Sequence, residues 1–154
     1  MIWEILFWNR LCGTVKAFYS RSLPVSVINE RMAVLRGYGI KFAMDDFGTG
    51  SSSSAMALEM LIDEIKIDMS FIRKILVNKK NKAIVQSMVD FANAANIKSC
   101  LEGVENKALE DYLRTVGATW FQGYYYSRPC PAEDFSKKYF NGKDKTGSYG
   151  CLKK

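Results

Sequence analysis

Short apolar runs and amphipathic stretches alternate four times along this 154-residue chain, and no other sequence feature restricts its fold as strongly. The apolar runs predict strands at residues 40–44, 64–68, 97–103 and 119–126, and the amphipathic stretches predict helices at residues 25–39, 54–61, 82–96 and 107–117. The spacing between these runs suits right-handed crossovers that join parallel strands. The sequence therefore predicts an α/β fold built on a parallel sheet.

One of the predicted helices carries a clear apolar stripe. The stripe follows the i, i+3, i+4, i+7 spacing of a helix that packs on a core, and it consists of Ile84, Val85, Met88, Phe91, Ala92 and Ala95. The run at residues 40–44 is almost entirely apolar, as expected of a strand that is buried in a parallel sheet. We therefore expect both segments to contribute to the core.

Histidine is absent from the chain, and its absence excludes several classes of site. Serine triads, cysteine–histidine pairs and the histidine-containing zinc motifs all need an imidazole. The four cysteines are widely spaced and form no CxxC pair, which argues against a zinc site and is typical of thiols in a reducing cytoplasm. Any hydrolysis is therefore expected to depend on carboxylates, lysine, amides and a bound metal ion.

The net charge of +6 comes from lysines and arginines that are mostly scattered, so the sequence predicts no nucleic-acid polymer as a partner. The apolar start at residues 1–8 is too short to cross a bilayer, and no other run approaches the length of a membrane span. This start also lacks the basic region and the cleavage site of a signal peptide. The prediction is a cytoplasmic protein without a membrane segment.

Polar side chains stand where each predicted strand ends. In chain order they are Asp45, Asp46, Lys66, Asp68, Glu102 and Gln122. The carboxyl ends of parallel strands gather at one face of the sheet, which is where ligands bind in such folds. Each residue taken singly also fits a structural role, because turns and strand ends are often polar. Their coincidence on four consecutive strands favours a ligand site.

The adjacent carboxylates of Asp45 and Asp46 repel each other unless a cation neutralises them. Oxygen donors without histidine suit Mg²⁺ or Mn²⁺ better than zinc. Two such ions bridged by one carboxylate can activate a water, which Lys66 and Gln122 are placed to orient. The sequence therefore predicts metal-assisted hydrolysis of a phosphate ester.

Four motifs then resemble a known family. They are "DDFGTG" at residues 45–50, "EIKIDMSFI" at 64–72, "LEGVEN" at 101–106 and "FQGYYYSRPCPAEDF" at 121–135. In this order and at these separations they resemble the second half of EAL domains, the cyclic di-GMP phosphodiesterases of bacteria. The resemblance implies a TIM-like (β/α)₈ barrel, of which this chain carries about the last four βα units. It also implies hydrolysis of cyclic di-GMP to linear pGpG with two Mg²⁺ or Mn²⁺ ions.

The same resemblance implies roles for the residues at the strand ends. Asp45 and Asp46 match the metal-binding aspartates of the family, and Glu102 matches the glutamate of the metal and water site. Lys66 matches the lysine that helps to position the attacking water, and Gln122 matches the glutamine of the last strand. Catalytic roles are therefore expected for Lys66, Glu102 and Gln122.

Further residues match the family's substrate-binding region. Asp68 matches an acidic position near the site, and Glu105 matches a glutamate that steadies the loop after the aspartate pair. That loop, residues 47–54, contains Gly48, Thr49 and Gly50, and in the family it is linked to substrate binding and dimerisation. Cyclic di-GMP is therefore the expected ligand, and a homodimer is one expected assembly.

The chain also departs from the family. It contains no E-A-L tripeptide, so the signature metal-ligand glutamate has no counterpart, and residues 1–24 match nothing in the family. We expect residues 25–140 to form the C-terminal half of the domain and residues 141–154 to be a disordered tail. The expectation is an incomplete metal site that is inactive unless the other half of the barrel is supplied. The alternative is a degenerate module that regulates by binding cyclic di-GMP or a protein.

Overall fold

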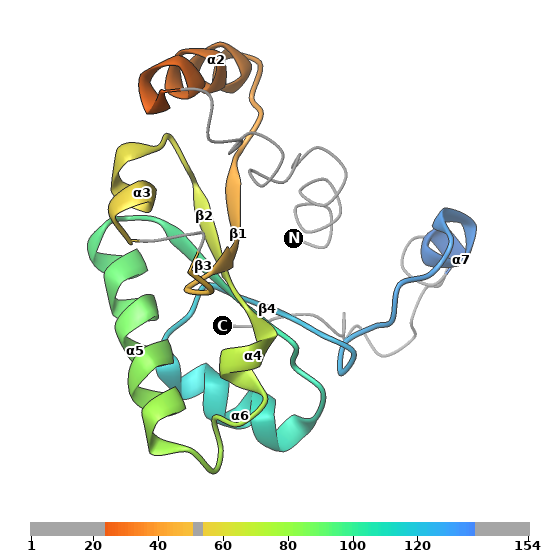
Figure 1. The fold of residues 1–154 in the computed structure, drawn as a ribbon. Helices are drawn as coiled ribbons and strands as arrows, with labels where there is room; N and C mark the ends of the chain where they lie inside the picture. Colours follow the sequence, from red (N-terminus) through yellow and green to blue (C-terminus); the bar gives the residue numbers. More distant parts are fainter. Residues whose placement is uncertain (1–23, 51–53, 138–154) are drawn as a thin grey trace.

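The computed structural model describes residues 24–50 and 54–137. Four parallel strands form one sheet in the order β1-β2-β3-β4, with β1 at Ala43–Phe47, β2 at Glu64–Ile67, β3 at Lys98–Glu102 and β4 at Trp120–Gln122. The helices are α2 (Val25–Gly37), α3 (Ser54–Glu59), α4 (Met69–Ile72), α5 (Lys79–Ala94), α6 (Lys107–Val116) and α7 (Ala132–Ser136). Spatial order thus follows chain order, as in part of a β/α barrel, and the α/β prediction is confirmed (Figure 1).

Local sequence signals explain where the two long helices between the strands begin and end. Asn78 caps α5 by accepting hydrogen bonds from the backbone N–H groups of Lys80 and Asn81, and Asn106 caps α6 in the same way through Leu109. These side-chain oxygens satisfy amides that have no partner within the helix. Gly117 ends α6 in the left-handed conformation that glycine adopts at little cost. The start of α5 and both ends of α6 are therefore set by local sequence.

The core lies between one face of the sheet and the helices drawn beside it in Figure 1. That face of the sheet is formed by Met44, Ile65, Ile67, Leu101 and Phe121, all of which are buried. Side chains alternate along a strand, so the residues between them project from the opposite face. The polar strand-end residues therefore stand on the face that the core does not use.

The apolar stripe of α5 is wider than the core contact that it makes. Val85, Val89 and Ala92 are fully buried, although the predicted stripe did not include Val89. Ile84, by contrast, keeps 41% of its surface exposed, and Phe91 is only partly buried. The stripe therefore supplies one edge to the core and leaves a second edge near the surface.

Two strands differ from the sequence prediction by more than one residue at an end. The first was expected at residues 40–44, but β1 begins at Ala43 and contains both aspartates. The last was expected at residues 119–126, but β4 has only three residues, because Gly123 begins a turn in which Tyr126 N–H donates to its carbonyl. The short helix α4, which directly follows β2, was not predicted.

Residues 1–23 and the predicted tail at residues 141–154 lie outside the described residues. The disorder expected of the tail therefore stays a prediction. Within residues 24–50 and 54–137, no helix has the length and apolar character needed to cross a bilayer. The short helix α7 stands away from the sheet in Figure 1.

Candidate metal site at the strand ends

A bulge in β1 places the two adjacent aspartates. Met44 pairs with Ile65 and Phe47 pairs with Ile67, so two residues of β1 stand opposite the single residue Lys66 of β2. In a regular strand, consecutive side chains point to opposite faces, whereas an inserted residue re-aims the side chains beside it. The bulge thus keeps Met44 and Phe47 on the buried face and frees both carboxylates for the other face.

Asp46 carries the distortion, since its φ of 50° lies in the left-handed region. For a residue other than glycine this conformation costs on the order of 1 kcal/mol, although aspartate tolerates it better than most. Thr49 stabilises the turn, because its backbone N–H and its hydroxyl both donate to the Asp46 carbonyl, at 3.2 and 2.8 Å. The sequence between residues 46 and 49 therefore closes the turn that aims the aspartates.

Three carboxylates meet at this point. One oxygen from each of Asp45, Asp46 and Glu102 lies within 4.8 Å of the other two, and all three residues are partly buried. Lys66 Nζ lies 3.3 Å from an oxygen of Asp45 and also contacts Glu102. The structure therefore brings together residues of β1, β2 and β3 that the sequence placed at separate strand ends.

The ammonium of Lys66 is held in its charged form. Burial lowers the pKa of Lys66, but the hydrogen bond to Glu102 and the negative charges of Glu102 and Asp45 outweigh burial, so the pKa is raised above its ordinary value. A lysine with a raised pKa stays protonated at neutral pH. Lys66 can therefore orient a water or offset phosphate charge, but it is not suited to remove a proton.

The donor set fits a divalent cation. Oxygens on opposite sides of a Mg²⁺ ion are separated by about 4.2 Å, and around Ca²⁺ by about 5 Å, given their usual metal–oxygen distances. One oxygen of each carboxylate lies within 4.8 Å of the other two, a bound that includes the separations of oxygens on one ion, so side-chain rotations would bring all three oxygens onto it. Asp45, Asp46 and Glu102 are the residues that would hold the metal, with Lys66 beside it.

Gln122 lies beside this cluster, because it pairs with Glu102 in the register of β3 and β4. Its carbonyl accepts a hydrogen bond of 3.0 Å from Val104 N–H, which ties the end of β4 to the loop after β3. The next residue, Gly123, allows this approach, since a Cβ there would lie 2.0 Å from the Val104 carbonyl oxygen. The absence of a side chain at Gly123 therefore permits the backbone contact at which β4 ends.

Two further predicted residues take other positions. Asp68 caps α4 by accepting a hydrogen bond of 2.9 Å from Ser70 N–H. Glu105 is exposed, and in the described parts of the chain no hydrogen bond or ion pair joins it to the loop that begins at Gly48. Its role in steadying that loop stays a prediction, and residues 51–53 of the loop lie outside the described residues.

Glu64 is a charged residue near the cluster that the sequence reading did not single out. It is buried at the start of β2, two residues before Lys66, so both side chains project from the same face. Burial raises its pKa from 4.5 to about 7, against the lowering effect of Lys66 and Lys98. The alternation of "EIKI" was the signal that could have placed Glu64 beside Lys66.

Comparisons with known proteins match most of this chain to one family. The family model described as "EAL domain" matches residues 19–129, so the expectation that residues 1–24 match nothing in the family is wrong for residues 19–24. The cyclic di-GMP phosphodiesterase PdeB of Shewanella oneidensis is 37% identical over 110 residues, which are 71% of this chain and 13% of PdeB. The chain thus spans a small part of this relative's length.

Solved structures extend the likeness to the fold. An EAL domain protein from Listeria monocytogenes EGD-e is 34% identical with a TM-score of 0.72, over 77% of this chain and 48% of that one. BlrP1 from Klebsiella pneumoniae, solved as a complex with manganese and cyclic di-GMP, is 36% identical with a TM-score of 0.62, over 67% of this chain and 26% of that one. The sheet and helices described above therefore correspond to part of a TIM-like barrel.

Proposed function

This chain belongs to the EAL domain family, and from this membership we propose that its strand-end cluster is one side of a metal-dependent cyclic di-GMP phosphodiesterase site. The reaction is hydrolysis of cyclic di-GMP to linear pGpG. The observation that carries the proposal is the position of Lys66, whose ammonium pairs with Asp45 and Glu102 within the cluster of three carboxylates. A cytoplasmic location is part of the proposal and rests on the cysteine pattern of the sequence.

Each residue of the cluster has a distinct task in this proposal. Asp45, Asp46 and Glu102 would hold Mg²⁺ or Mn²⁺, which supplies Lewis-acid stabilisation of phosphate charge and a water of lowered pKa. Lys66 stays protonated, so it offsets the negative charge that develops on the phosphodiester. Gln122, paired with Glu102 in the sheet, orients the attacking water through its side-chain amide.

We further propose that the 154-residue polypeptide does not turn over the substrate by itself. Hard divalent cations take six or more oxygen ligands, and the described cluster offers three carboxylates. The sequence contains no E-A-L tripeptide to supply the family's signature glutamate. Activity would then need a partner that completes the barrel, namely a polypeptide that carries the other half.

Hydrolysis of cyclic di-GMP in the presence of Mn²⁺, measured with the purified chain by chromatography of pGpG, tests both proposals. We expect no turnover by the chain alone. Turnover that Asp45→Asn abolishes would support the site and refute inactivity. Turnover that Asp45→Asn and Lys66→Met leave unchanged would refute the assignment of the cluster.

Calorimetric titration with cyclic di-GMP in Ca²⁺ distinguishes the enzyme proposal from the regulatory alternative. A chain that binds the nucleotide but gains no activity from a separately produced N-terminal half of an EAL domain would act as a binding module. A chain that gains activity only with that half would be the catalytic side of a split enzyme. A chain that neither binds nor gains activity would refute both functions.

A further inference from the structure

The turn that aims Asp46 is supported from the helical side of the sheet. Phe47, the residue after the bulge, is buried in register with Ile67. Its ring stacks on the ring of Phe91 of α5, with centroids 5.9 Å apart and an angle of 11° between the planes. The side chain directly after the aspartate pair is therefore held by one aromatic contact on α5.

A second contact holds the following residue. Gly48 has a φ of 94°, and a Cβ built there would lie 2.3 Å from Met88 Cε and 3.1 Å from the ring of Phe71. The tip of Met88 thus fills the space that a side chain at position 48 would need. Phe91 and Met88 lie three residues apart on α5, so they project from the same side of the helix.

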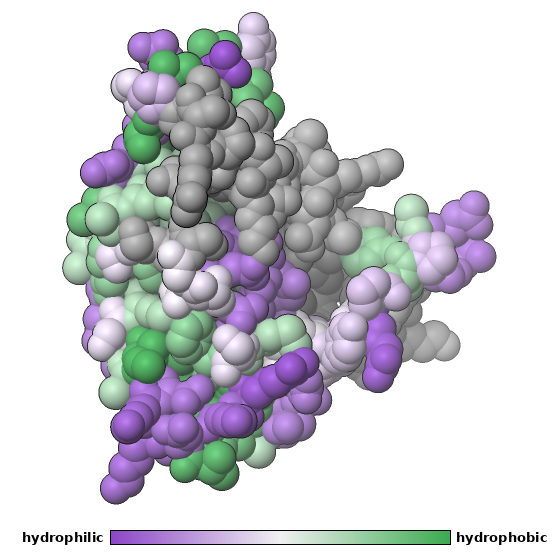
Figure 2. Space-filling view, in the orientation of Figure 1, coloured by the Kyte–Doolittle hydropathy of each residue, from purple (hydrophilic) through white to green (hydrophobic). Residues whose placement is uncertain are grey.

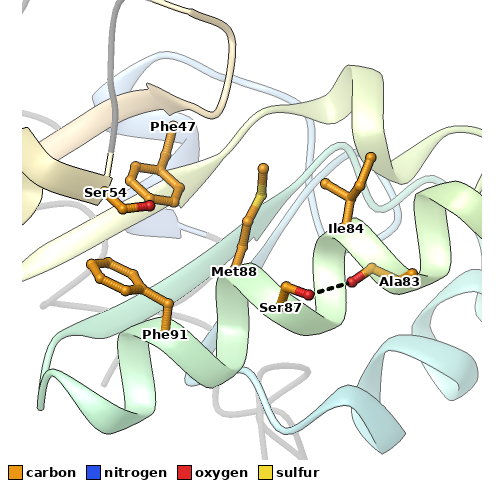
Figure 3. Close-up of a pocket in the computed structure, with 7 residues that line it drawn as sticks. All are labelled: Phe47, Ser54, Ala83, Ile84, Ser87, Met88 and Phe91. Atoms are coloured by element: carbon orange, nitrogen blue, oxygen red, sulfur yellow. Dashed lines mark hydrogen bonds between the residues drawn. The ribbon is translucent and has the colours of Figure 1, made fainter.

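These supports border an open groove of about 330 Å³. Figure 3 shows Met88 and Phe91 projecting from α5 toward Phe47. Ser54 of α3 also lines the groove, and Ser87 donates a hydrogen bond to the Ala83 carbonyl. Apolar residues gather on this side of the molecule, over α3 and α5 (Figure 2). Phe47 is buried and Phe91 is partly buried, so the stack lies at the boundary between the core and this groove.

We propose that Phe91 and Met88 are positioning residues for the metal ligands. They act through Phe47 and Gly48, and they hold Asp46 in the left-handed conformation that sets its carboxylate beside those of Asp45 and Glu102. The inference rests on the metal site proposed above and adds the residues of α5 that set its geometry. Neither residue belongs to the ligand cluster itself.

Mn²⁺ affinity, measured from the electron paramagnetic resonance signal of the free ion, tests this role in the full chain. Residues that orient metal ligands change affinity by about tenfold or more, so we expect Phe91→Leu to weaken Mn²⁺ binding about tenfold. Phe91→Tyr keeps the ring and is expected to keep the affinity. Met88→Ala is expected to weaken Mn²⁺ binding. Met88→Leu preserves most of the contact and is expected to keep the wild-type affinity.

Val89→Ala is the matched control, because Val89 is fully buried on the same helix, whereas the atoms nearest to a Cβ at Gly48 belong to Met88 and Phe71. It should lower the free energy of unfolding while leaving Mn²⁺ affinity within about twofold of the wild-type value. Equal weakening of binding by Phe91→Leu and Val89→Ala would overturn the proposal, since the effect would then be general destabilisation. Unchanged affinity in Phe91→Leu would overturn it as well.

Hydrogen exchange of the Thr49 amide gives a second readout that needs no metal. This amide donates to the Asp46 carbonyl, so its protection reports whether the turn is closed. When the two variants are compared under conditions that give them the same free energy of unfolding, we expect this amide to exchange about fivefold faster in Phe91→Leu than in Val89→Ala. A wild-type chain that binds no Mn²⁺ would refute the proposed metal site, and equal Thr49 exchange in the two variants would refute the positioning role.

Discussion

Lys66 Nζ lies 3.3 Å from an oxygen of Asp45 on β1 and also contacts Glu102 on β3, so one ammonium joins carboxylates of the two neighbouring strands. In the metal-free chain Lys66 is the cation nearest to these carboxylates among the described residues. A metal ion would compete with Lys66 for the same oxygens. The stability of the chain and its affinity for metal are therefore linked through this residue.

Lys66→Met should lower the free energy of unfolding by about 2 kcal/mol without metal, because Asp45 and Glu102 lose the cation that pairs with them. This is below the loss expected for a fully buried pair, since the side chains of Lys66, Asp45 and Glu102 are 15–22% exposed. Excess Mn²⁺ should raise the melting temperature of the variant more than that of the wild type. Thermal unfolding followed by circular dichroism measures both effects.

Lys107→Met is the control for this experiment, since Lys107 pairs with Asp111 across one helical turn at the surface. An exposed pair contributes little, so no resolvable change in stability and no change in the Mn²⁺ response are expected. A Lys66→Met chain that melts like the wild type, with and without Mn²⁺, would contradict the linkage.

Asp46→Asn and Asp46→Ala should separate the charge of Asp46 from its backbone conformation. Both remove a carboxylate from the cluster, so both should weaken Mn²⁺ binding about tenfold or more. Only alanine is poorly suited to a φ of 50°, so only Asp46→Ala should also lose about 1 kcal/mol of stability. Urea unfolding and Mn²⁺ titration check the two effects, and equal stability of the two variants would show that the strain is absent.

The buried carboxyl of Glu64 predicts a pH dependence of stability. Its pKa in the folded chain is about 7, against 4.5 in the unfolded chain, so the folded chain binds more protons between these values. The free energy of unfolding should therefore fall as the pH rises from about 4.5 to about 7, by about 3 kcal/mol from this group. Above that range the contribution of Glu64 stays constant.

Glu64→Gln removes this titration and is expected to stabilise the chain at pH values above about 7. Urea unfolding of both chains across the pH range is the measurement. The two profiles should converge toward the acidic end, where Glu64 is protonated in both states. Parallel profiles over the whole range would mean that the pKa of Glu64 is the same in the folded and unfolded chains.

Gly123→Ala should displace the end of β4, since its Cβ would lie 2.0 Å from the backbone oxygen of Val104. We expect a loss of about 2 kcal/mol or more in the free energy of unfolding. Gly117→Ala is the control, because Gly117 has a φ of 84° but open space around its Cα, so that only the conformational cost of about 1 kcal/mol applies. Equal losses in the two variants would contradict the close approach of Val104 and Gly123.

Much of the fold could be predicted from the sequence, because the alternation of strands and helices is a local pattern. The helix that follows Asn106 and ends at Gly117 was predicted within one residue, since its cap and its terminating glycine are local signals. The bounds of the first strand were harder to predict. The first strand was predicted too early in the chain, because the apolar run before β1 suggested that the strand ends where the aspartates begin.

The candidate site was predictable in its members but not in its geometry. Asp45, Asp46, Lys66 and Glu102 were expected at one end of the sheet, and the structure brings their charged groups together. The contacts of Phe91 and Met88 with the turn were not expected, because the stripe of α5 only indicated a core-facing helix. Side-chain periodicity shows which face of a helix is apolar, but not which loop that face supports.

By itself the sequence determined the order of strands and helices, the family and the carboxylate chemistry of the strand ends, since each depends on residue type and spacing. Only the tertiary structure decided that Asp45 and Asp46 share one face, because a regular strand would send consecutive side chains to opposite faces. The register slip opposite Lys66 and the left-handed Asp46 remove that alternation. Pairing with β2 and packing against α5 hold the slip in place, and neither can be read from a local pattern.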